Sequence, residues 1–394
     1  MEQNCSLLQK IRLFVLDLDG TVYLGDRLLE GAADFIASAK EKGRRILFFT
    51  NNTSRSPLEY VERLTRMGIP VTRADILTAG DVTLHYLQTH CAGQSVYLLG
   101  VPALRQSFLE AGIPLTEEQP DLVVVGFDKA LTYERLEKAA PDPEMFKIFR
   151  YKYDGHNLKT IIKAQSCGNS TEGLLSPLGT VDEKTLLQGL RDGDFGELEP
   201  RIAQAALQAR ETLAKTNDPQ MVDIIIDRAV LESMSALAGQ YKSKFLTRLV
   251  NANIDIANIR SFVRIKRIGK DLRFLKEVLA DGGSIAVPRY LELFPKTFDD
   301  FFEMLDGTPY GPALSGAYDA IKNHGTLSEF EKLCDNFMVE VLKESRFIPF
   351  GIEPVLSYLL AKENEVQAIR IVMASKIAGV DPDKITERLR ETYA

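Results

Sequence analysis

Hydrophobic residues follow two different spacings along this chain, one in each half. Up to about residue 126, short apolar runs alternate with helical patterns, and the runs lie at residues 11–16, 46–50, 76–79, 96–99 and 122–125. Apolar runs separated by helices are typical of βαβ units with a largely parallel sheet. The first part of the chain is therefore predicted to be α/β.

After Pro143 the apolar residues recur every three or four positions, and no comparable strand candidates appear between them. This spacing places them on one face of a helix, as in Ile202, Ala205, Ala206, Ala209 and Leu213, and again in Phe330, Leu333, Cys334, Phe337 and Val341. The second part is therefore predicted to be all-α.

The change of pattern falls at residues 139–143, whose sequence is Ala-Ala-Pro-Asp-Pro. The two prolines lack backbone donors and push the residues before them out of the helical region. We expect a multidomain chain, with one domain over residues 1–139 and an all-α domain of helical repeats over residues 140–394.

A short motif occurs three times in the helical part, at residues 154–159, 255–260 and 365–370. Each copy has an acidic residue, a polar or small residue three positions later, an aliphatic residue and then a base. Acid and base pairs are common solvated decoration on a single helix. Three copies at similar spacing predict similar helical units packed side by side.

A glycine turn that leads to another helix follows each copy, at residues 179–181, 283–285 and 379–382. In the last turn, Asp381 is predicted to cap a helix and Pro382 to be its first residue.

Four segments of this half look like the C-type stalk subunit of bacterial and archaeal V/A-type ATPases, which is equivalent to the eukaryotic d-type subunit: residues 149–159, 253–260, 308–310 and 362–370. The resemblance runs from about residue 141 to 394. It implies a funnel-shaped protein of three similar helical units that couples the central rotor shaft to the membrane proteolipid ring. In that family about one more helical stretch precedes the first motif, and here another segment takes its place.

The helical half offers no nucleotide site, because it contains no GxxxxGK[ST] loop and no Gly-rich turn after a strand. Any link to ATP hydrolysis would therefore run through partner subunits, namely the shaft subunits and the ring. The coupling ion, H⁺ or Na⁺, stays open.

Two acidic residues, Asp17 and Asp19, end the first predicted strand, which we expect to be buried. Alternation along a strand puts both on one face, at the carboxyl end where open α/β sheets bind ligands. Coincidence is the bland explanation, but two anions beside a core strand need a partner. A metal ion is the natural one.

A second predicted strand ends in the hydroxyl and amide cluster at residues 50–54. Such donors suit phosphate oxygens, and a plain Asx or Ser/Thr turn is the alternative explanation. Residues 17–25 and 49–54 together resemble the first two motifs of the haloacid dehalogenase superfamily, nearest to its NagD and p-nitrophenylphosphatase-like members. Residues 7–139 match, and residues 120–128 look like the opening half of that family's cap.

This second resemblance implies a partial Rossmann-like core with part of a cap. By position, Asp17 would attack phosphorus to form an aspartyl phosphate and Asp19 would act as acid and base. Thr50 and Asn51 would hold the phosphoryl group. Mg²⁺ would be bound by Asp17 and Asp19 if this part is functional.

The family's lysine motif and its later GDxxxxD-like motif have no plausible counterpart after residue 139. The nearest candidates, residues 193–197 and 299–300, do not follow a strand. Because the missing motif belongs to a strand beside that of Asp17, truncation should leave central sheet edges unpaired.

The bulk composition changes this picture little. The chain has 394 residues, 45% of them hydrophobic, and a net charge of -7 without a basic excess in either half, so nucleic-acid binding is not expected. Four scattered cysteines suggest neither disulfides nor a zinc site and fit a reducing cytosol. With no signal peptide or apolar run near about 18 residues, we expect a cytoplasmic chain that contacts the membrane only through partners.

Three hypotheses remain open. In the first, the chain is a rotary ATPase stalk subunit with an inert N-terminal passenger. In the second, it is a Mg²⁺-dependent phosphatase acting on a small phosphate ester, with the helical half as a scaffold. In the third, two unrelated genes have been joined, which leaves neither function whole.

Overall fold

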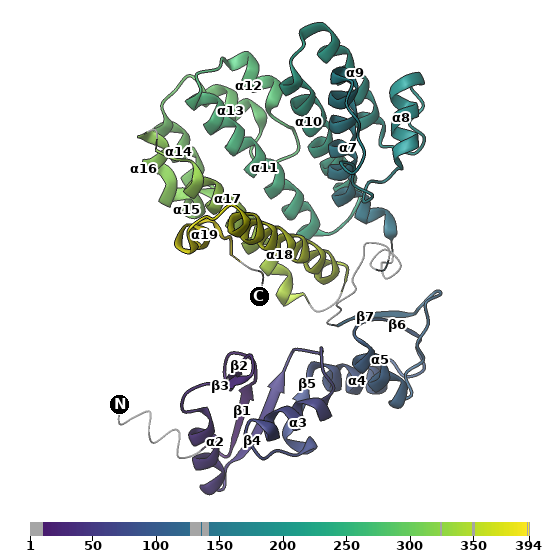
Figure 1. The fold of residues 1–394 in the computed structure, drawn as a ribbon, viewed down its shortest axis with the longest axis vertical. Coiled ribbons are helices and arrows are strands. Elements are labelled where there is room, and N and C mark those ends of the chain that lie inside the picture. The colour runs from purple at the N-terminus through teal and green to yellow at the C-terminus, as the bar shows by residue number, and fades with distance from the viewer. Residues whose placement is uncertain are drawn as a thin grey trace. The chain divides into compact units, whose positions relative to one another are not determined.

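A computed structural model of the chain describes residues 11–126, 135, 142–323, 325–348, 351–391 and 393 (Figure 1). The chain divides into two compact units, Met1–Pro141 and Asp142–Ala394, called here the N-terminal unit and the helical unit. The junction predicted near residue 140, the end of the segment at residues 120–128 and one of the four cysteines, Cys5, lie outside the described residues.

The N-terminal unit contains a parallel sheet in the order β1–β4–β5, formed by Leu13–Asp17, Arg45–Thr50 and Ile76–Thr78. A second parallel pair joins β6 (Val96–Leu99) to β7 (Leu122–Val125). The predicted strands and their parallel pairing are confirmed, but they divide between two sheets. The hairpin of β2 (Tyr23–Leu24) and β3 (Arg27–Leu28) was not predicted, because two-residue strands leave no alternating pattern.

One face of the first sheet is covered by helices α2 (Ala32–Glu41) and α3 (Pro57–Arg66). Phe14 and Leu16 of β1 pack there with the buried Ile46 and Phe48 of β4, as the parallel register requires. Helix α3 begins at a capping box, in which Ser56 and Glu59 satisfy each other's backbone N–H groups.

The other face of β1 is open. Leu13 and Val15 are 45% and 58% exposed, although parallel strands are usually covered on both faces. Within the described residues β1 pairs only with β4, so it is an edge strand. The prediction of a buried strand is therefore wrong for this face, since an apolar run does not reveal whether anything covers it.

Helices α4 (Ala79–His90) and α5 (Pro102–Glu110) accompany the second sheet. Their buried Leu87, Leu104 and Phe108 pack with Val96 and Leu98 of β6. This small core is separate from that of the first sheet. A 3-10 turn, η1 (Arg73–Asp75), precedes β5.

The helical unit contains no strand in the part that the structure describes, which confirms the all-α prediction there. Its elements are η2 (Pro143–Phe146), α7 (Lys147–Cys167), α8 (Glu183–Asp192), α9 (Pro200–Thr216), α10 (Pro219–Ala238), α11 (Lys244–Arg267), α12 (Leu272–Val278), α13 (Val287–Leu293), α14 (Phe298–Asp306), α15 (Tyr310–Leu314), η3 (Ser315–Ala317), α16 (Tyr318–Lys322), α17 (Ser328–Lys343), η4 (Glu344–Phe347), α18 (Glu353–Ile377) and α19 (Pro382–Arg388).

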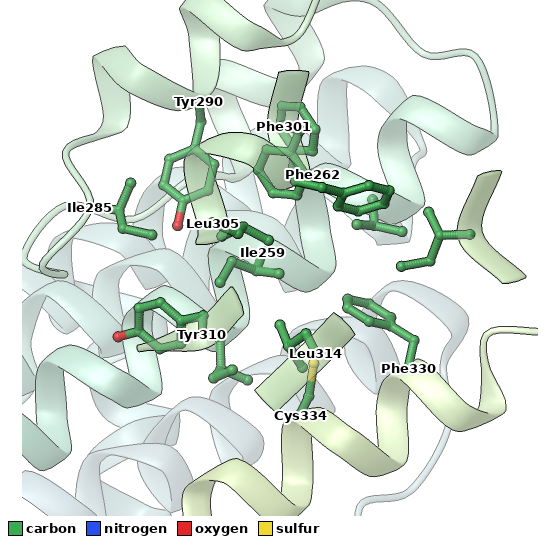
Figure 2. Packing of buried hydrophobic residues seen from close by; sticks show 14 of the residues in the cluster. Ile259, Phe262, Ile285, Tyr290, Phe301, Leu305, Tyr310, Leu314, Phe330 and Cys334 are labelled. Carbon is green, nitrogen blue, oxygen red and sulfur yellow. The ribbon is translucent and has the colours of Figure 1, made fainter. Parts of the chain in front are cut away.

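Helices α7, α9 and α10 pack side by side, and α11 packs against α10 and α17 (Figure 1). The core around α11 is rich in aromatic side chains, with Phe262 stacked on Phe301 at 4.0 Å between ring centroids (Figure 2). Tyr290, Phe330 and Cys334 complete this core and are almost fully buried. Offset aromatic contacts of this kind add to the stability that burial of apolar area provides.

The last helix begins as predicted. Asp381 accepts a hydrogen bond from the backbone N–H of Asp383, and Pro382 is the first residue of α19. Among the described residues, no helix is both long and apolar enough to span a bilayer.

Candidate functional site

The first copy of the repeated motif ties α7 to the turn that follows it. Asp154 is fully buried, and its carboxylate accepts the backbone N–H and the hydroxyl of Thr180, both at 2.7 Å. Asn157, one turn later, donates to the carbonyl of Ser176 at 2.9 Å and accepts its N–H at 2.8 Å. A Cβ at Gly179 would overlap the Asp154 carboxylate, so glycine is required there.

The second copy repeats this arrangement on α11. The buried Asp255 accepts the N–H groups of Ser284 at 2.8 Å and Ile285 at 3.1 Å, and also the Ser284 hydroxyl. Asn258 exchanges two hydrogen bonds with the backbone of Ala280, at 2.8 and 3.0 Å. A Cβ at Gly283 would overlap the Asp255 carboxylate. We call each set of contacts a carboxylate lock.

The third copy forms no such lock with any residue that the structure describes. Glu365 is exposed and pairs with Lys362 of the same helix at 2.6 Å. Ala368 stands where the other copies have asparagine, so the side chain that would bind a turn is absent. The repeat is therefore structural in two copies and incomplete in the third.

Burial changes the acidity of the groups in both locks. Desolvation raises the pKa of Asp154, and the two hydrogen bonds from Thr180 oppose that effect. Desolvation, followed by the hydrogen bond to Asp255, raises the pKa of Tyr310. The polar groups of the motif are thus engaged inside the protein and not presented to a ligand.

A cavity of about 570 Å³ opens at the start of α11. Three basic residues line it, but Arg248 already forms a bidentate ion pair with Glu344, at 2.7 and 2.8 Å. Ser243, also in its wall, caps α11 and donates to Glu353 at 2.8 Å. The remaining lining residues are Tyr241, Lys242, Lys244, Thr247, Asn251, Ala252, Ser284, Pro309, Tyr310 and Phe337.

In the N-terminal unit, the ends of β1 and β4 bring the predicted site residues to one edge of the sheet. Asp17 pairs in register with Phe49, which places Asp19 beside the segment that follows Thr50. The amide Nδ2 of Asn52 lies 3.4 Å from Oδ2 of Asp19. Asn52 was not singled out from the sequence, although it belongs to the polar cluster at residues 50–54.

The cluster after β4 is held by its own hydrogen bonds. Thr50 is buried, and its hydroxyl accepts the N–H of Asn52 at 3.1 Å. The amide oxygen of Asn52 accepts the N–H of Ser54 at 3.0 Å, and Tyr60 donates its hydroxyl to the Asn52 carbonyl at 2.7 Å. Asn51 is exposed. The loop is therefore pre-formed, with the Asn51 side chain facing solvent.

Tyr23 lies beneath this edge, fully buried, with a hydroxyl that has no partner among the described residues. Burial raises the pKa of Tyr23 to about 12, with a smaller contribution from the negative charge of Asp19. The Arg63 guanidinium sits 4.5 Å from the centre of its ring and pairs with Asp26 at 3.2 Å.

The donor set suits Mg²⁺ in kind, since Asp17 and Asp19 offer hard carboxylate oxygens and one or two carboxylates are a common protein contribution to such sites. No group of three or more His, Cys, Asp or Glu residues that could hold a metal occurs in the described part of the chain. The sequence candidates for a third ligand have other roles: Asp300 caps α14 with Thr297, Asp299 pairs with Lys322, and Asp194 accepts the N–H of Gly196.

Two family models match the chain. The model described as ATP synthase (C/AC39) subunit covers residues 129–388, and the model described as haloacid dehalogenase-like hydrolase covers residues 14–114. The 5′-nucleotidase YutF of Bacillus subtilis (strain 168) is 36% identical over 122 residues, which are 31% of this chain and 48% of its own. The chain thus spans about half the length of the curated relatives it matches.

Solved structures give a similar result for the N-terminal unit. A 4-nitrophenylphosphatase from Thermotoga maritima is 46% identical, with 34% of this chain and 51% of that chain covered and a TM-score of 0.33. A glycerol phosphate phosphatase from Mycobacterium tuberculosis in complex with magnesium is 32% identical, with coverages of 33% and 40% and a TM-score of 0.31. The chain belongs to the ATP synthase (C/AC39) subunit family through residues 129–388, and its residues 14–114 match the haloacid dehalogenase-like hydrolase family.

Proposed function

We propose that this chain is a non-catalytic central-stalk subunit of a V/A-type rotary ATPase or ATP synthase. In this role the helical unit couples the rotor shaft to the membrane proteolipid ring, and the chain is cytoplasmic and peripheral to the membrane through the complex. Family membership through residues 129–388 supports the assignment to a rotary ATPase complex.

The carboxylate locks are the observation that carries the coupling role. A part that transmits torque needs helices that do not slide over one another, and buried, fully satisfied polar networks make a packed core rigid and specific. Asp154 and Asp255 each tie a long helix to the turn after it.

We further propose that the N-terminal unit is catalytically inactive. Two carboxylates stand at the sheet edge, and no third metal-binding group joins them among the described residues. Within the described residues, strand β1 also has an unpaired edge, where the family's further strand would pair according to the sequence resemblance, and its Val15 is exposed.

Complementation tests the coupling role. The full chain is added to a V/A-type ATPase from which its own C-type stalk subunit has been deleted, and ATP-driven ion uptake into vesicles is measured together with co-sedimentation. Association and restored uptake are expected, and the double variant Asp154→Ala, Asp255→Ala should lose both. Failure of the unaltered, folded chain to associate with the complex would contradict the proposal.

A Mg²⁺-dependent phosphatase is the second candidate, and the contact between Asp19 and Asn52 favours it, because it joins a carboxylate to a donor cluster suited to phosphate. Asp17 would then attack phosphorus, Asp19 would serve as acid and base, and Thr50 and Asn51 would hold the phosphoryl group. Asp17 and Asp19 would hold Mg²⁺, which when bound would offset the negative charges of carboxylate and ester.

Release of p-nitrophenol from p-nitrophenyl phosphate, with and without MgCl₂, separates the two candidates. Inactivity of the unaltered chain is expected under the first. Magnesium-dependent turnover that disappears in Asp17→Asn would establish the second, whereas turnover that persists in Asp17→Asn would point to a contaminating enzyme.

A further inference from the structure

Two ion pairs align α10 on α7. Lys159 Nζ lies 2.5 Å from Asp227 Oδ1, and Lys163 Nζ lies 2.5 Å from Asp223 Oδ1. The base number rises by four while the acid number falls by four, so α10 runs antiparallel to α7.

The same ladder joins α17 to α11. Arg260 pairs with Asp335, and Arg264 Nη2 lies 2.6 Å from Glu331 Oε1. Aligning the motifs at Asp154 and Asp255 places Lys159 and Arg260 at equivalent positions, as well as Lys163 and Arg264. Each of the first two repeat helices, α7 and α11, therefore packs against an antiparallel helix and is joined to it by two ion pairs at equivalent positions.

Apolar residues beside these bases are buried. On α7 they are Leu158 and Ile162, and on α11 they are Ile259 and Val263, all at most 2% exposed. Removing such side chains from water provides most of the free energy of a helix–helix contact, while the ion pairs fix its register.

In the third repeat helix, α18, no described part of the chain covers the same positions. Its equivalents of those positions, Ile369 and Met373, are 50% and 58% exposed. Val366 and Ile377 are exposed as well, and their spacing puts all four on one side of the helix. Arg370, at the position of Lys159 and Arg260, is exposed and forms no ion pair within the described residues.

We propose that this surface, the α18 face (Val366, Ile369, Arg370, Met373 and Ile377), binds an antiparallel amphipathic α-helix of a partner protein. That helix carries a carboxylate opposite Arg370 and large apolar residues on the same side. The inference rests on the internal repeat alone, so it does not depend on the proposed stalk function.

Of the two covering helices, α10 and α17, α17 is the better model for the partner helix. The α11 residues at the positions of Val366, Ile369 and Met373 are Ile256, Ile259 and Val263, which are also apolar and share a core cluster with Phe330 and Cys334 of α17. On α7 the residue equivalent to Val366 is Gly155, and Val230 of α10 lies in the space beside it. The pair of α7 and α10 is therefore a poorer model for the α18 face, which has a valine at this position.

The charges on α18 indicate which charged residues the partner helix needs. Helix α18 has Ala374 at the position where α7 and α11 have a second base, so one acidic residue on the partner helix is enough. A single helix on one face buries less area than a standard protein interface, so a dissociation constant on the order of 10–100 µM is expected.

The probe is a fluorescein-labelled peptide with the sequence of α17 (Ser328–Lys343), carrying Cys334→Ala. A hydrocarbon staple joins positions 332 and 336 on its other side, so that the helix is formed before binding and an absence of binding cannot be due to the cost of folding it. Fluorescence anisotropy is followed as the full chain is added. Far-UV circular dichroism verifies that every variant is folded.

Saturable binding is expected, weakened at least about tenfold by Ile369→Glu. The matched control Ile268→Glu, at another exposed isoleucine, should leave it unchanged. Arg370→Glu should also weaken binding, and a peptide with Asp335→Lys should restore it to that variant.

Three outcomes would overturn the proposal. They are no saturation up to about 1 mM chain, equal binding to the Ile369→Glu variant, or no restoration in the charge-swapped pair. Sedimentation velocity adds a fourth: a dimer that Ile369→Glu abolishes would assign the α18 face to a second copy of this chain instead of a partner helix.

Discussion

The hydroxyl of Tyr310 donates a hydrogen bond to Oδ2 of Asp255 across 2.6 Å, in the interior of the helical unit. The two residues are 55 positions apart, so the contact ties α15 to α11. Asp154 accepts hydrogen bonds from Thr180, but no tyrosine among the described residues donates to it, so the second carboxylate lock has more hydrogen bonds there.

Asp255→Ala should lower the free energy of unfolding by about 3–5 kcal/mol, because it leaves several buried donors without an acceptor. Tyr310→Phe removes the hydrogen bond to Asp255 and a 3.4 Å contact with the Ser284 hydroxyl, and it should cost about 1.5–3 kcal/mol. Urea denaturation followed by far-UV circular dichroism measures both. Tyr318→Phe is the control, since the Asp306 that it contacts is exposed, and it should cost less than Tyr310→Phe.

Gly179→Ala and Gly283→Ala should each destabilise the helical unit by about 1–3 kcal/mol, since the added Cβ overpacks a buried carboxylate. Gly316→Ala is a matched control, because a Cβ there would meet Leu333 at an ordinary 3.6 Å. Thermal unfolding midpoints of the three variants test this. Equal unfolding midpoints for all three variants would show that the locks accommodate a Cβ without loss of stability.

The pH dependence of stability should differ in sign between two aspartates. Burial raises the pKa of Asp154, so the folded state binds its proton more readily than the unfolded state does. The stability of the unaltered chain relative to Asp154→Asn should therefore increase as pH falls from about 7 toward the ordinary aspartate pKa.

Asp300 is the contrasting case. Hydrogen bonds from Thr297 lower its pKa, so its contribution is present above the ordinary pKa and is lost as pH falls. The stability of the unaltered chain relative to Asp300→Asn should therefore stay level over that range and decrease only as pH falls below the ordinary aspartate pKa. Urea titrations of all three proteins at several pH values provide the comparison, and parallel curves for the two variants would refute the assignment.

The open face of β1 makes a prediction about the N-terminal unit. Val15→Lys should change stability by less than about 0.5 kcal/mol, because the side chain already meets water. Phe48→Ala, on the covered face, should cost about 3–5 kcal/mol. Binding of a hydrophobic dye should fall in Val15→Lys, and unfolding of this variant would mean that the face is covered.

The sequence predicted the parts of this fold that depend on local pattern. The change from strands to helices, the parallel arrangement of the strands and the cap at Asp381 all follow from such patterns. The three copies of the motif were also visible, but their difference was not. Whether an acidic residue is locked or solvated depends on a turn about 25 to 30 residues away and on the residue three positions on, asparagine in two copies and alanine in the third.

The candidate site was also predicted only in part. Asp17, Asp19, Thr50 and Asn51 come from two strand ends, and parallel pairing brings those ends to one edge. Asn52 and Tyr23 were missed, because their contacts with Asp19 or its surroundings depend on backbone turns that the apolar pattern does not record. The exposure of β1 was missed since it reflects the absence of a neighbour.

The burial of Cys334 in the core beside Arg260 gives the protein an internal reporter. Desolvation raises the pKa of this thiol to about 11, so the reactive thiolate is scarce and shielded while the core is closed. Cys167 lies in the open on the same unit. The rate of alkylation of Cys334, compared with that of Cys167, would therefore measure how often the aromatic core opens locally. No reporter residue has to be introduced into the chain for this measurement.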